Sequence, residues 1–258
     1  MPKASEKFAA LFGHREVLEL ERDAKDLIDP DQLIGIEIEC ENAAKMGAKI
    51  QNEAVHWNTE TDQSLRNNGK EFVLKRPLKG RQLAGAIHEF FEYANNYKLS
   101  YNERTSCHIH FDCRNLTYKE FSALLLVYQA VEAAFWTVVN KSRRWSGYCL
   151  PMLESQGSAV AAVLAPSGTI NAIKMAISEV SRYSALNIQA FPKYGSVEYR
   201  HFHNPTEPAQ LFGWINIATA IRQVAVEVSK AVGGGVLKAW VEEDPERLIK
   251  LVRANPVL

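Results

Sequence analysis

The sequence predicts an α+β fold in which a mainly antiparallel β-sheet has helices on one side. Two segments, residues 33–41 and 105–113, alternate apolar and polar residues at a period of two, which is typical of strands with one face in the core. The other expected strands come in pairs, and helices form long excursions between them rather than a strict βαβα alternation. This organisation favours an antiparallel-rich sheet of the α+β class.

The first half of the chain carries most of the expected strands. Asn67, Asn68 and Gly69 predict a turn between two of these strands. Thr117 and Glu120 have the spacing of a capping box at the start of a long apolar helix. The expected elements are, in order, a charged helix at 5–27, strands at 33–41, 53–59 and 71–75, a helix at 81–97, a strand at 105–113 and a helix at 118–139.

The second half is expected to be mainly helical and to belong to the same domain. Two strands are expected to join near Pro192 and Gly195, and no linker divides the chain. We therefore expect a single domain over 1–258, with an N-terminal helix in 1–30, a core in 31–205 and a helical segment in 206–258. The remaining expected elements are a polar loop at 140–151, a mobile loop at 155–168, a helix at 170–180, strands at 183–190 and 196–202, and helices at 208–232 and 237–253.

Composition argues against a protein that is recruited by its overall charge. The chain has 30 basic and 30 acidic residues, so no net field attracts nucleic acid or an anionic membrane. Apolar runs are shorter than the roughly 20 residues that a spanning helix needs, and residues 1–25 have no signal-peptide core. The four cysteines are too irregularly spaced for a disulfide framework. We expect a cytoplasmic protein with free thiols that does not enter a membrane.

The strand expected at 33–41 has an acidic face. Glu37, Glu39 and Glu41 alternate with Ile36, Ile38 and Cys40. Same-face residues of a strand lie about 7 Å apart, so ionised glutamates there repel one another. One interpretation is an edge strand whose acidic face meets solvent. The other is a cation cage, because hard divalent ions need several carboxylate oxygens.

A second strand adds imidazoles to this chemistry. His108, His110 and Asp112 share one face of the strand expected at 105–113, whereas Cys107 and its apolar neighbours share the other. Two imidazoles and a carboxylate predict a metal or anion site, with a pair of exposed strand histidines as the alternative. Because Cys107 and Cys113 point the opposite way, a zinc site of local cysteines and histidines is disfavoured.

Two further segments offer charged side chains. Glu198 and Arg200 share a face of the strand expected at 196–202, where they form either an in-strand ion pair or a metal ligand beside an anion clamp. Asp62 stands in a turn ahead of Glu71, which opens a strand. These two acids are either further ligands or ordinary turn residues.

Taken in order, these segments resemble the amidoligases, carboxylate–amine ligases related to glutamine synthetase and glutamate–cysteine ligase. The resemblance spans residues 34–202, and many relatives have Gly where this chain has Cys107. The motifs that carry it are Gly35-Ile-Glu-Ile-Glu39, Asp62-x-Ser64, Gly69-x-Glu71, Arg76-Pro-Leu, Thr105-Ser-Cys-His-Ile-His-Phe111, Arg182 with Leu186-Asn187, and Gly195-Ser-Val-Glu-Tyr-Arg200.

The resemblance implies a curved, mainly antiparallel sheet of the glutamine synthetase-like catalytic type, with the site on its concave face. It also implies substrate contacts through His110, Asn187 and Arg200, of which His110 and Arg200 take part in catalysis. Asp62 would lie near the incoming amine and accept its proton. The implied metal ligands are Glu37, Glu39, Glu71, His108 and Glu198, and the implied nucleotide-phosphate contacts are Arg143, Arg144 and Arg182.

The function that follows is ATP- and Mg²⁺-dependent formation of an amide bond through an acyl phosphate, with Mn²⁺ as an alternative metal. Phosphorylation makes a carboxylate reactive toward an amine, and divalent cations and arginine offset the phosphate charge. The partners would be small-molecule or peptide acids and amines, and a nucleic-acid base or protein side chain also fits. Two other functions remain open, a metal-dependent hydrolase and a non-catalytic binding protein. The sequence does not determine the oligomeric state.

Overall fold

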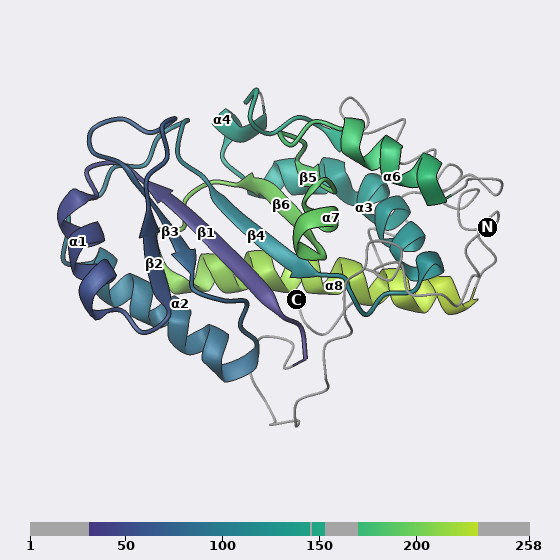
Figure 1. Cartoon of the computed structure of the whole chain (residues 1–258), viewed down its shortest axis with the longest axis horizontal. Coiled ribbons are helices and arrows are strands. Elements are labelled where there is room, and N and C mark those ends of the chain that lie inside the picture. The colour runs from purple at the N-terminus through teal and green to yellow at the C-terminus, as the bar shows by residue number, and fades with distance from the viewer. Residues whose placement is uncertain (1–30, 145, 153–169, 232–258) are drawn as a thin grey trace.

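The computed structural model describes residues 31–144, 146–152 and 170–231, and within them the centre of the fold is a six-stranded antiparallel sheet (Figure 1). This architecture confirms the expected α+β class. The strand order is β2-β3-β1-β4-β6-β5, so the two strands with the strongest alternation, β1 and β4, are neighbours near the middle. The strands are β1 (Ile34–Cys40), β2 (Trp57–Glu60), β3 (Lys70–Leu74), β4 (Cys107–Asp112), β5 (Leu186–Asn187) and β6 (Ser196–Phe202).

Helices cover the apolar face of the sheet. The long helix α8 passes behind the strands in Figure 1, and α3 packs against it. The expected capping box is present, because Thr117 and Glu120 each bond the other's backbone at the start of α3. The helices are α1 (Ala44–Glu53), α2 (Gly80–Ala94), α3 (Tyr118–Val138), α4 (Lys141–Arg144), α6 (Ile170–Glu179), α7 (Ala190–Tyr194) and α8 (Pro208–Ala231).

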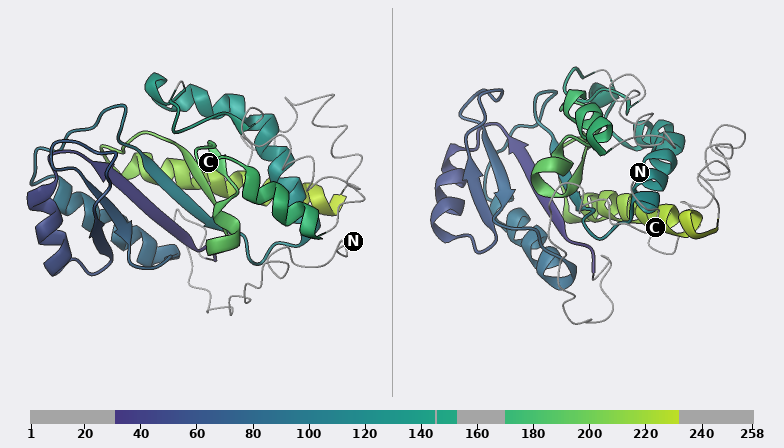
Figure 2. Two further views of the ribbon diagram at one scale, coloured as in Figure 1. Left: turned by 45° about the horizontal axis from the view of Figure 1, so that its top comes forward. Right: turned by 45° about the vertical axis from the view of Figure 1, so that its right-hand side comes forward.

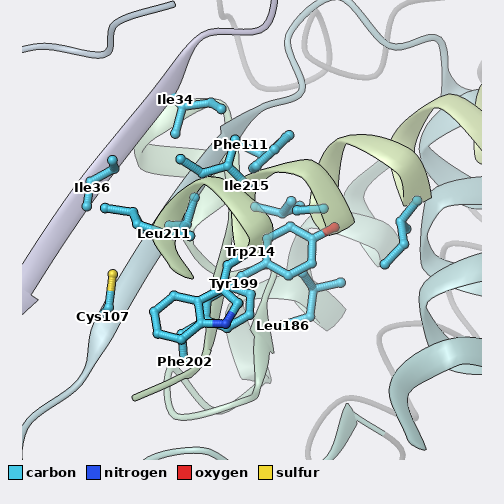
Figure 3. Close-up of a cluster of buried hydrophobic side chains, with 14 of the residues drawn as sticks. Ile34, Ile36, Cys107, Phe111, Leu186, Tyr199, Phe202, Leu211, Trp214 and Ile215 are labelled. Atoms are coloured by element: carbon cyan, nitrogen blue, oxygen red, sulfur yellow. The ribbon is translucent and has the colours of Figure 1, made fainter. Parts of the chain in front are cut away.

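The core lies between the apolar face of the sheet and the helices. Ile36 and Ile38 of β1 are almost completely buried, as are Cys107 and Ile109 of β4. Figure 3 shows how residues of α8 meet this face, and Figure 2 shows α8 and the sheet from two further sides. Complete burial of one such aliphatic side chain contributes about 1.5–3 kcal/mol to the stability of the folded state. The apolar face that the alternation predicts is therefore the buried face of the sheet.

A β-bulge interrupts the pairing of β4 with β6. Cys107 pairs with Phe202 and Ile109 with Tyr199, so β6 has one residue more than β4 over this interval. As a result, the consecutive residues His201 and Phe202 both pack against helices, His201 against Tyr128 of α3 and Phe202 against Trp214 of α8. The ring of Phe202 stacks on the ring of Trp214 of α8, with 4.7 Å between the two ring centres. The bulge lies beside the polar residues of the sheet.

The helix α1 is absent from the sequence prediction, and the strand expected at 53–59 begins only at Trp57. Gly47 in the middle of α1 weakens the helical pattern, since glycine lowers helix propensity. It also permits close packing, because a Cβ at this position would lie 3.0 Å from Thr59 and 3.2 Å from Lys70. The helix therefore packs closely against the sheet at Gly47, whose carbonyl accepts a hydrogen bond from Oγ1 of Thr59 at 3.1 Å.

The strand expected at 183–190 is also shorter than predicted. Only β5 joins the sheet, because the backbone just before it pairs with Leu150 instead, through Leu150 N–H to the Tyr183 carbonyl at 2.8 Å and Ala185 N–H to the Leu150 carbonyl at 2.7 Å. Residues 190–194 form α7, and the polar loop at 140–151 contains α4. The helices expected at 5–27 and 237–253 and the loop at 155–168 lie outside the described residues.

All four cysteines are buried free thiols, as expected. Among the described helices, none combines the length and the apolar character that crossing a membrane requires.

Candidate active site

Strand register brings the predicted polar residues together on the face opposite the core. Glu37 of β1 pairs with His108 of β4, and Glu39 pairs with Glu71 of β3. On the other side of β4, His110 pairs with Glu198 of β6. Directly paired residues have Cβ atoms about 4.5–5.5 Å apart, so four strands contribute to one cluster.

The first group of potential metal ligands consists of Glu37, His108 and Glu198. Nδ1 of His108 lies 3.2 Å from Oε2 of Glu37 and 3.4 Å from Oε1 of Glu198. One ligand atom from each residue fits within 4.8 Å of the others. Two carboxylates and one imidazole suit Mg²⁺ or Mn²⁺, which bind oxygen-rich sites.

The second group consists of Glu39, Glu71 and the same His108, again with ligand atoms within 4.8 Å of one another. Nε2 of His108 lies 2.9 Å from Oγ of Ser106, which donates to Oε2 of Glu39 at 2.6 Å. The two ring nitrogens of His108 therefore face different groups. A neutral imidazole has one free lone pair, so His108 can complete only one of the two groups at a time.

The pKa of Glu71 reflects both its burial and the crowding of negative charge around it. Burial first, and then the charges of Glu37, Glu39 and Asp62, raise the pKa of Glu71 to about 8. Like charges on directly paired strand residues destabilise a sheet. A divalent cation would remove this repulsion, so the cluster has the electrostatics of a cation site.

Hydrogen bonds and opposite charges lower the pKa values of two other carboxylates. Burial by itself would raise the pKa of Glu37, but hydrogen bonds from His108 and His110 outweigh it and hold the pKa well below its usual range. For Glu198, Arg200 is the strongest influence that opposes burial, and the pKa of Glu198 is lowered. Both groups are therefore ionised at neutral pH and available to a cation.

His110 supports Glu37. Its Nε2 lies 3.1 Å from Oε1 of Glu37, and its Nδ1 lies 3.2 Å from Oγ of Ser196. Gly35 is the cross-strand partner of His110, and a Cβ at Gly35 would approach the Cβ of His110 to 3.3 Å. The glycine that opens the β1 motif thus leaves room for the histidine. His110 orients a potential metal ligand and does not line the cavity described next.

A cavity of about 230 Å³ opens above this cluster. Carboxylates form part of its wall and arginines form another part, which makes it suited to a cation and an anion together. Its lining residues are Glu37, Glu39, Asp62, Ser64, Glu71, Arg104, Ser106, His108, Arg143, Tyr148, Arg182, Tyr183 and Arg200.

The bulge in β6 is held by Arg143 of α4. Its Nη2 donates to the carbonyl of Arg200 at 2.7 Å and its Nε to the carbonyl of His201 at 3.4 Å. These are the bulged residues, so Arg143 supplies donors to carbonyls near the interrupted ladder. Arg143 is only 2% exposed and still lines the cavity. Its burial is the main cause that lowers its pKa.

Glu41 is a structural carboxylate and lies outside both groups of potential ligands. It is 1% exposed and accepts hydrogen bonds from Arg66 N–H at 2.9 Å, Asn67 Nδ2 at 3.1 Å and Asn102 Nδ2 at 2.9 Å. Arg104 Nε donates to it at 3.1 Å. Glu41 thereby joins two loops that contribute to the cavity.

The loop that carries Asp62 and Ser64 reaches the cavity from the end of β2. Oδ1 of Asp62 accepts the Ser64 N–H at 2.7 Å, which closes a local turn. Asn67 and Asn68 of the same loop adopt φ values of 51° and 56°, a conformation that asparagine tolerates. Asp62 is half-buried and borders Glu71 closely enough to raise its pKa.

Three predicted residues lie elsewhere. Asn187 is buried and donates to Oε2 of Glu198 at 2.7 Å, so it orients a potential metal ligand without lining the cavity. Arg144 is exposed and does not line the cavity. Asp112 shares the face of the histidines but pairs with Arg114 at 2.8 Å.

Five lining residues are absent from the predicted site, and Ser64 is one of them, because it enters only as part of a motif. Ser106 precedes His108 by two positions, so the alternation of β4 could have placed it on the polar face. Arg104, Tyr148 and Tyr183 belong to loops, and loop residues carry no periodic signal.

The sequence matches no protein-family model, and a search of curated proteins finds no match. The residues and geometry of the site itself therefore carry the functional argument.

Proposed function

We propose that this chain is an ATP- and Mg²⁺-dependent carboxylate–amine ligase with a glutamine synthetase-like catalytic fold. The observation that carries the proposal is the lining of a single cavity. Its wall contains Glu37, Glu39, Glu71 and His108, which are four of the five residues of the two groups of potential cation ligands. Arg143, Arg182 and Arg200 contribute the opposite charge. Phosphoryl transfer requires both kinds of group, cations to bridge phosphate oxygens and guanidinium groups to offset charge.

The metals, when bound, would supply charge neutralisation for the phosphates and hold the reacting oxygens in line. Glu37, Glu198 and His108 would hold one ion, and Glu39 and Glu71 would contribute carboxylates to a neighbouring one. Transfer of the terminal phosphoryl group of ATP to the acid substrate would yield an acyl phosphate and ADP. Attack by the amine would then form the amide and release phosphate.

Individual residues have distinct roles in this proposal. Arg200 is held by Glu198 and by a 3.4 Å hydrogen bond from its Nε to the Tyr148 carbonyl, so its guanidinium is oriented before phosphate arrives. Asp62 would accept a proton from the attacking amine, because it is the half-buried lining carboxylate that lies outside both groups of metal ligands. Arg182 would contact phosphate from the exposed side.

The first test is calorimetric titration of ATP into the full chain with and without Mg²⁺. We expect Mg²⁺-dependent binding in the wild type and loss of that binding in Glu39→Gln, which removes one ligand charge with little change of shape. Glu92→Gln is the matched control, because Glu92 is exposed on α2, far from the site in the fold. Screening acid and amine pairs for ADP release would then identify the substrates.

Two outcomes would contradict the proposal. A folded wild type that binds Mg²⁺ or Mn²⁺ but no nucleotide would support a metal-dependent hydrolase instead. A wild type that binds neither metal nor nucleotide would support a non-catalytic binding protein.

A further inference from the structure

Two tyrosines and two arginines that line the cavity form a cluster. This tyrosine–arginine cluster consists of Tyr148, Tyr183, Arg182 and Arg200, all of which line the cavity. The guanidinium of Arg182 lies 4.9 Å from the ring centre of Tyr183, and that of Arg200 lies 6.0 Å from the same centre. Cation–π contacts at these distances are favourable.

Tyr183 holds the cluster together. Its hydroxyl oxygen accepts a hydrogen bond from Nη2 of Arg182 at 2.8 Å, in addition to the contact between the guanidinium and the ring. Two guanidinium groups therefore lie against one aromatic ring before any ligand binds. This arrangement reduces the cost of ordering long side chains around a phosphate.

Tyr148 differs from Tyr183 because its ring is open to solvent. The residue is 50% exposed although its neighbour Cys149 is completely buried. The rings of Tyr148 and Tyr183 meet at 5.4 Å with an interplanar angle of 81°. In this edge-to-face contact at least one face of Tyr148 is left uncovered by Tyr183.

The backbone beneath the exposed ring is well anchored. The Tyr148 N–H donates to Oγ of Ser146 at 3.2 Å, and the Tyr148 carbonyl accepts from Arg200 at 3.4 Å. The next N–H, that of Cys149, donates to the Ser146 carbonyl at 3.0 Å. The backbone that carries the exposed ring is therefore bonded to an arginine of the cavity, and the ring itself contacts Tyr183.

The size of the cavity indicates what this ring could contact. Pockets that enclose a whole drug-sized ligand have volumes of roughly 300–1,000 Å³, whereas this cavity measures about 230 Å³. It is large enough for phosphates and cations but too small for a complete nucleotide. The planar base of a nucleotide would have to lie at the mouth, beside the phosphate-facing arginines.

We propose that the ring of Tyr148 is the platform on which the base of ATP stacks, with Tyr183 holding Arg182 and Arg200 toward the phosphates. This inference rests on the proposed ligase function and adds the part of the site that recognises the base. A base presents a π-face whatever its identity, so stacking on a tyrosine would favour nucleotides over inorganic phosphates.

The test compares Mg²⁺–ATP with Mg²⁺–triphosphate, the inorganic ion that lacks base and ribose, by calorimetry on the full chain. We expect the wild type to bind ATP more tightly than triphosphate. Tyr148→Ala should weaken ATP binding on the order of ten-fold and leave triphosphate binding unchanged. Tyr148→Phe keeps the ring and should bind ATP within about two-fold of the wild type, which separates stacking from hydrogen bonding.

Three results would overturn the platform and leave the ligase proposal intact. These are equal weakening of ATP and triphosphate in Tyr148→Ala, unchanged ATP binding in that variant, and equal affinity of the wild type for the two ligands. A folded wild type that binds neither ligand would instead overturn the ligase proposal, and the base platform with it. Because Tyr148 is half exposed, circular dichroism should show that both variants fold.

Discussion

The two faces of the sheet are built from the same strands and have opposite physical characters. On one face of β1, Ile36 and Ile38 are buried against helices, whereas on the other Glu37 and Glu39 point toward a cavity. The apolar face gains free energy from removing hydrocarbon from water. The polar face brings carboxylates together, which costs free energy.

One face of the sheet therefore stabilises the fold, and the other carries the candidate site. Paired glutamates such as Glu39 and Glu71 do not help a protein fold, and burial, followed by the charges of Glu37 and Glu39, raises the pKa of Glu71. Glu41 differs from them, because four donor residues satisfy its carboxylate. A carboxylate on this side of the sheet can therefore be recognised as structural or as a candidate ligand by its partners.

The largest effect is expected on the apolar face. Ile38→Ala should lower the free energy of unfolding by about 2–5 kcal/mol, because Ile38 is completely buried and its removal leaves a cavity. Urea denaturation would measure the change. Val55→Ala is the control, since Val55 is 71% exposed and its truncation should change stability by less than about 0.5 kcal/mol. Equal effects of the two substitutions would contradict the assignment of this face to the core.

Substitution of the structural carboxylate Glu41 should have the next largest effect on stability. Glu41→Gln removes a charge-assisted bond to Arg104 and should destabilise the protein by about 1.5–3 kcal/mol. Glu103→Gln is the control, because Glu103 contacts the same Arg104 at 3.7 Å but is 68% exposed. Exposed pairs contribute about 0–1 kcal/mol. A loss from Glu103→Gln as large as that from Glu41→Gln would refute the distinction.

Replacement of Glu71, a potential metal ligand, should stabilise the metal-free protein rather than destabilise it. In the metal-free protein, burial and neighbouring charges raise the pKa of Glu71 from 4.5 to about 8. The stability that the protein has when Glu71 is protonated is therefore fully present below pH 4.5. It is lost as the pH rises toward 8, because Glu71 then ionises among other negative charges. Glu71→Gln should stabilise the metal-free protein at pH 9 by roughly 1–2 kcal/mol, after allowance for screening by water, and change little at pH 4.

Thermal unfolding at both pH values would measure this effect. The same substitution should abolish the stabilisation that Mg²⁺ or Mn²⁺ gives to the wild type. Destabilisation of the metal-free protein at pH 9 would show that Glu71 is a structural carboxylate like Glu41.

Cation binding should release a proton. Because the pKa of Glu71 is about 8 in the metal-free protein, the group is largely protonated at pH 7 and must ionise to bind a metal. Calorimetry of Mn²⁺ binding in two buffers with different ionisation enthalpies should show release of somewhat less than one proton per Mn²⁺ bound. Glu71→Gln is the control for the origin of that proton, and release that is independent of Glu71 would be evidence against its role as a ligand.

The smallest effect is expected at Gly35. Gly35→Ala places a Cβ 3.3 Å from the Cβ of His110, so the histidine must shift by a few tenths of an ångström. We expect a stability change within about 1 kcal/mol and a metal affinity that falls several-fold, because His110 orients Glu37. Metal titration of the variant would measure the loss. Unchanged affinity would mean that the position of His110 does not influence the cation site.

Much of the sheet and the cluster could be predicted from the sequence. The alternation around Glu37 and Glu39 identified β1 with its two faces, and His108 identified β4. The helix α1 could not be predicted in the same way, because Gly47 weakens its pattern and packs closely against Thr59 and Lys70. A local pattern cannot report a contact with a distant segment.

The site shows the same division between local and distant information. Alternation predicted that Arg200 shares a face with Glu198. Continued strictly, the same period would put Phe202 on that polar face, but the bulge returns Phe202 to the core. Tyr148 and Tyr183 come from loops, where no period exists, and only folding brings them to the cavity.

Outside the bulge in β6, the sequence by itself determined which residues of a strand share a face, because the pleat alternates side chains regardless of what lies beside the strand. The tertiary structure alone decided which strands are neighbours and in what register. Glu39 meets Glu71, and Glu37 meets His108, through backbone pairing between segments that are distant in the chain. Such pairing depends on the packing of the whole core, so no single segment encodes it.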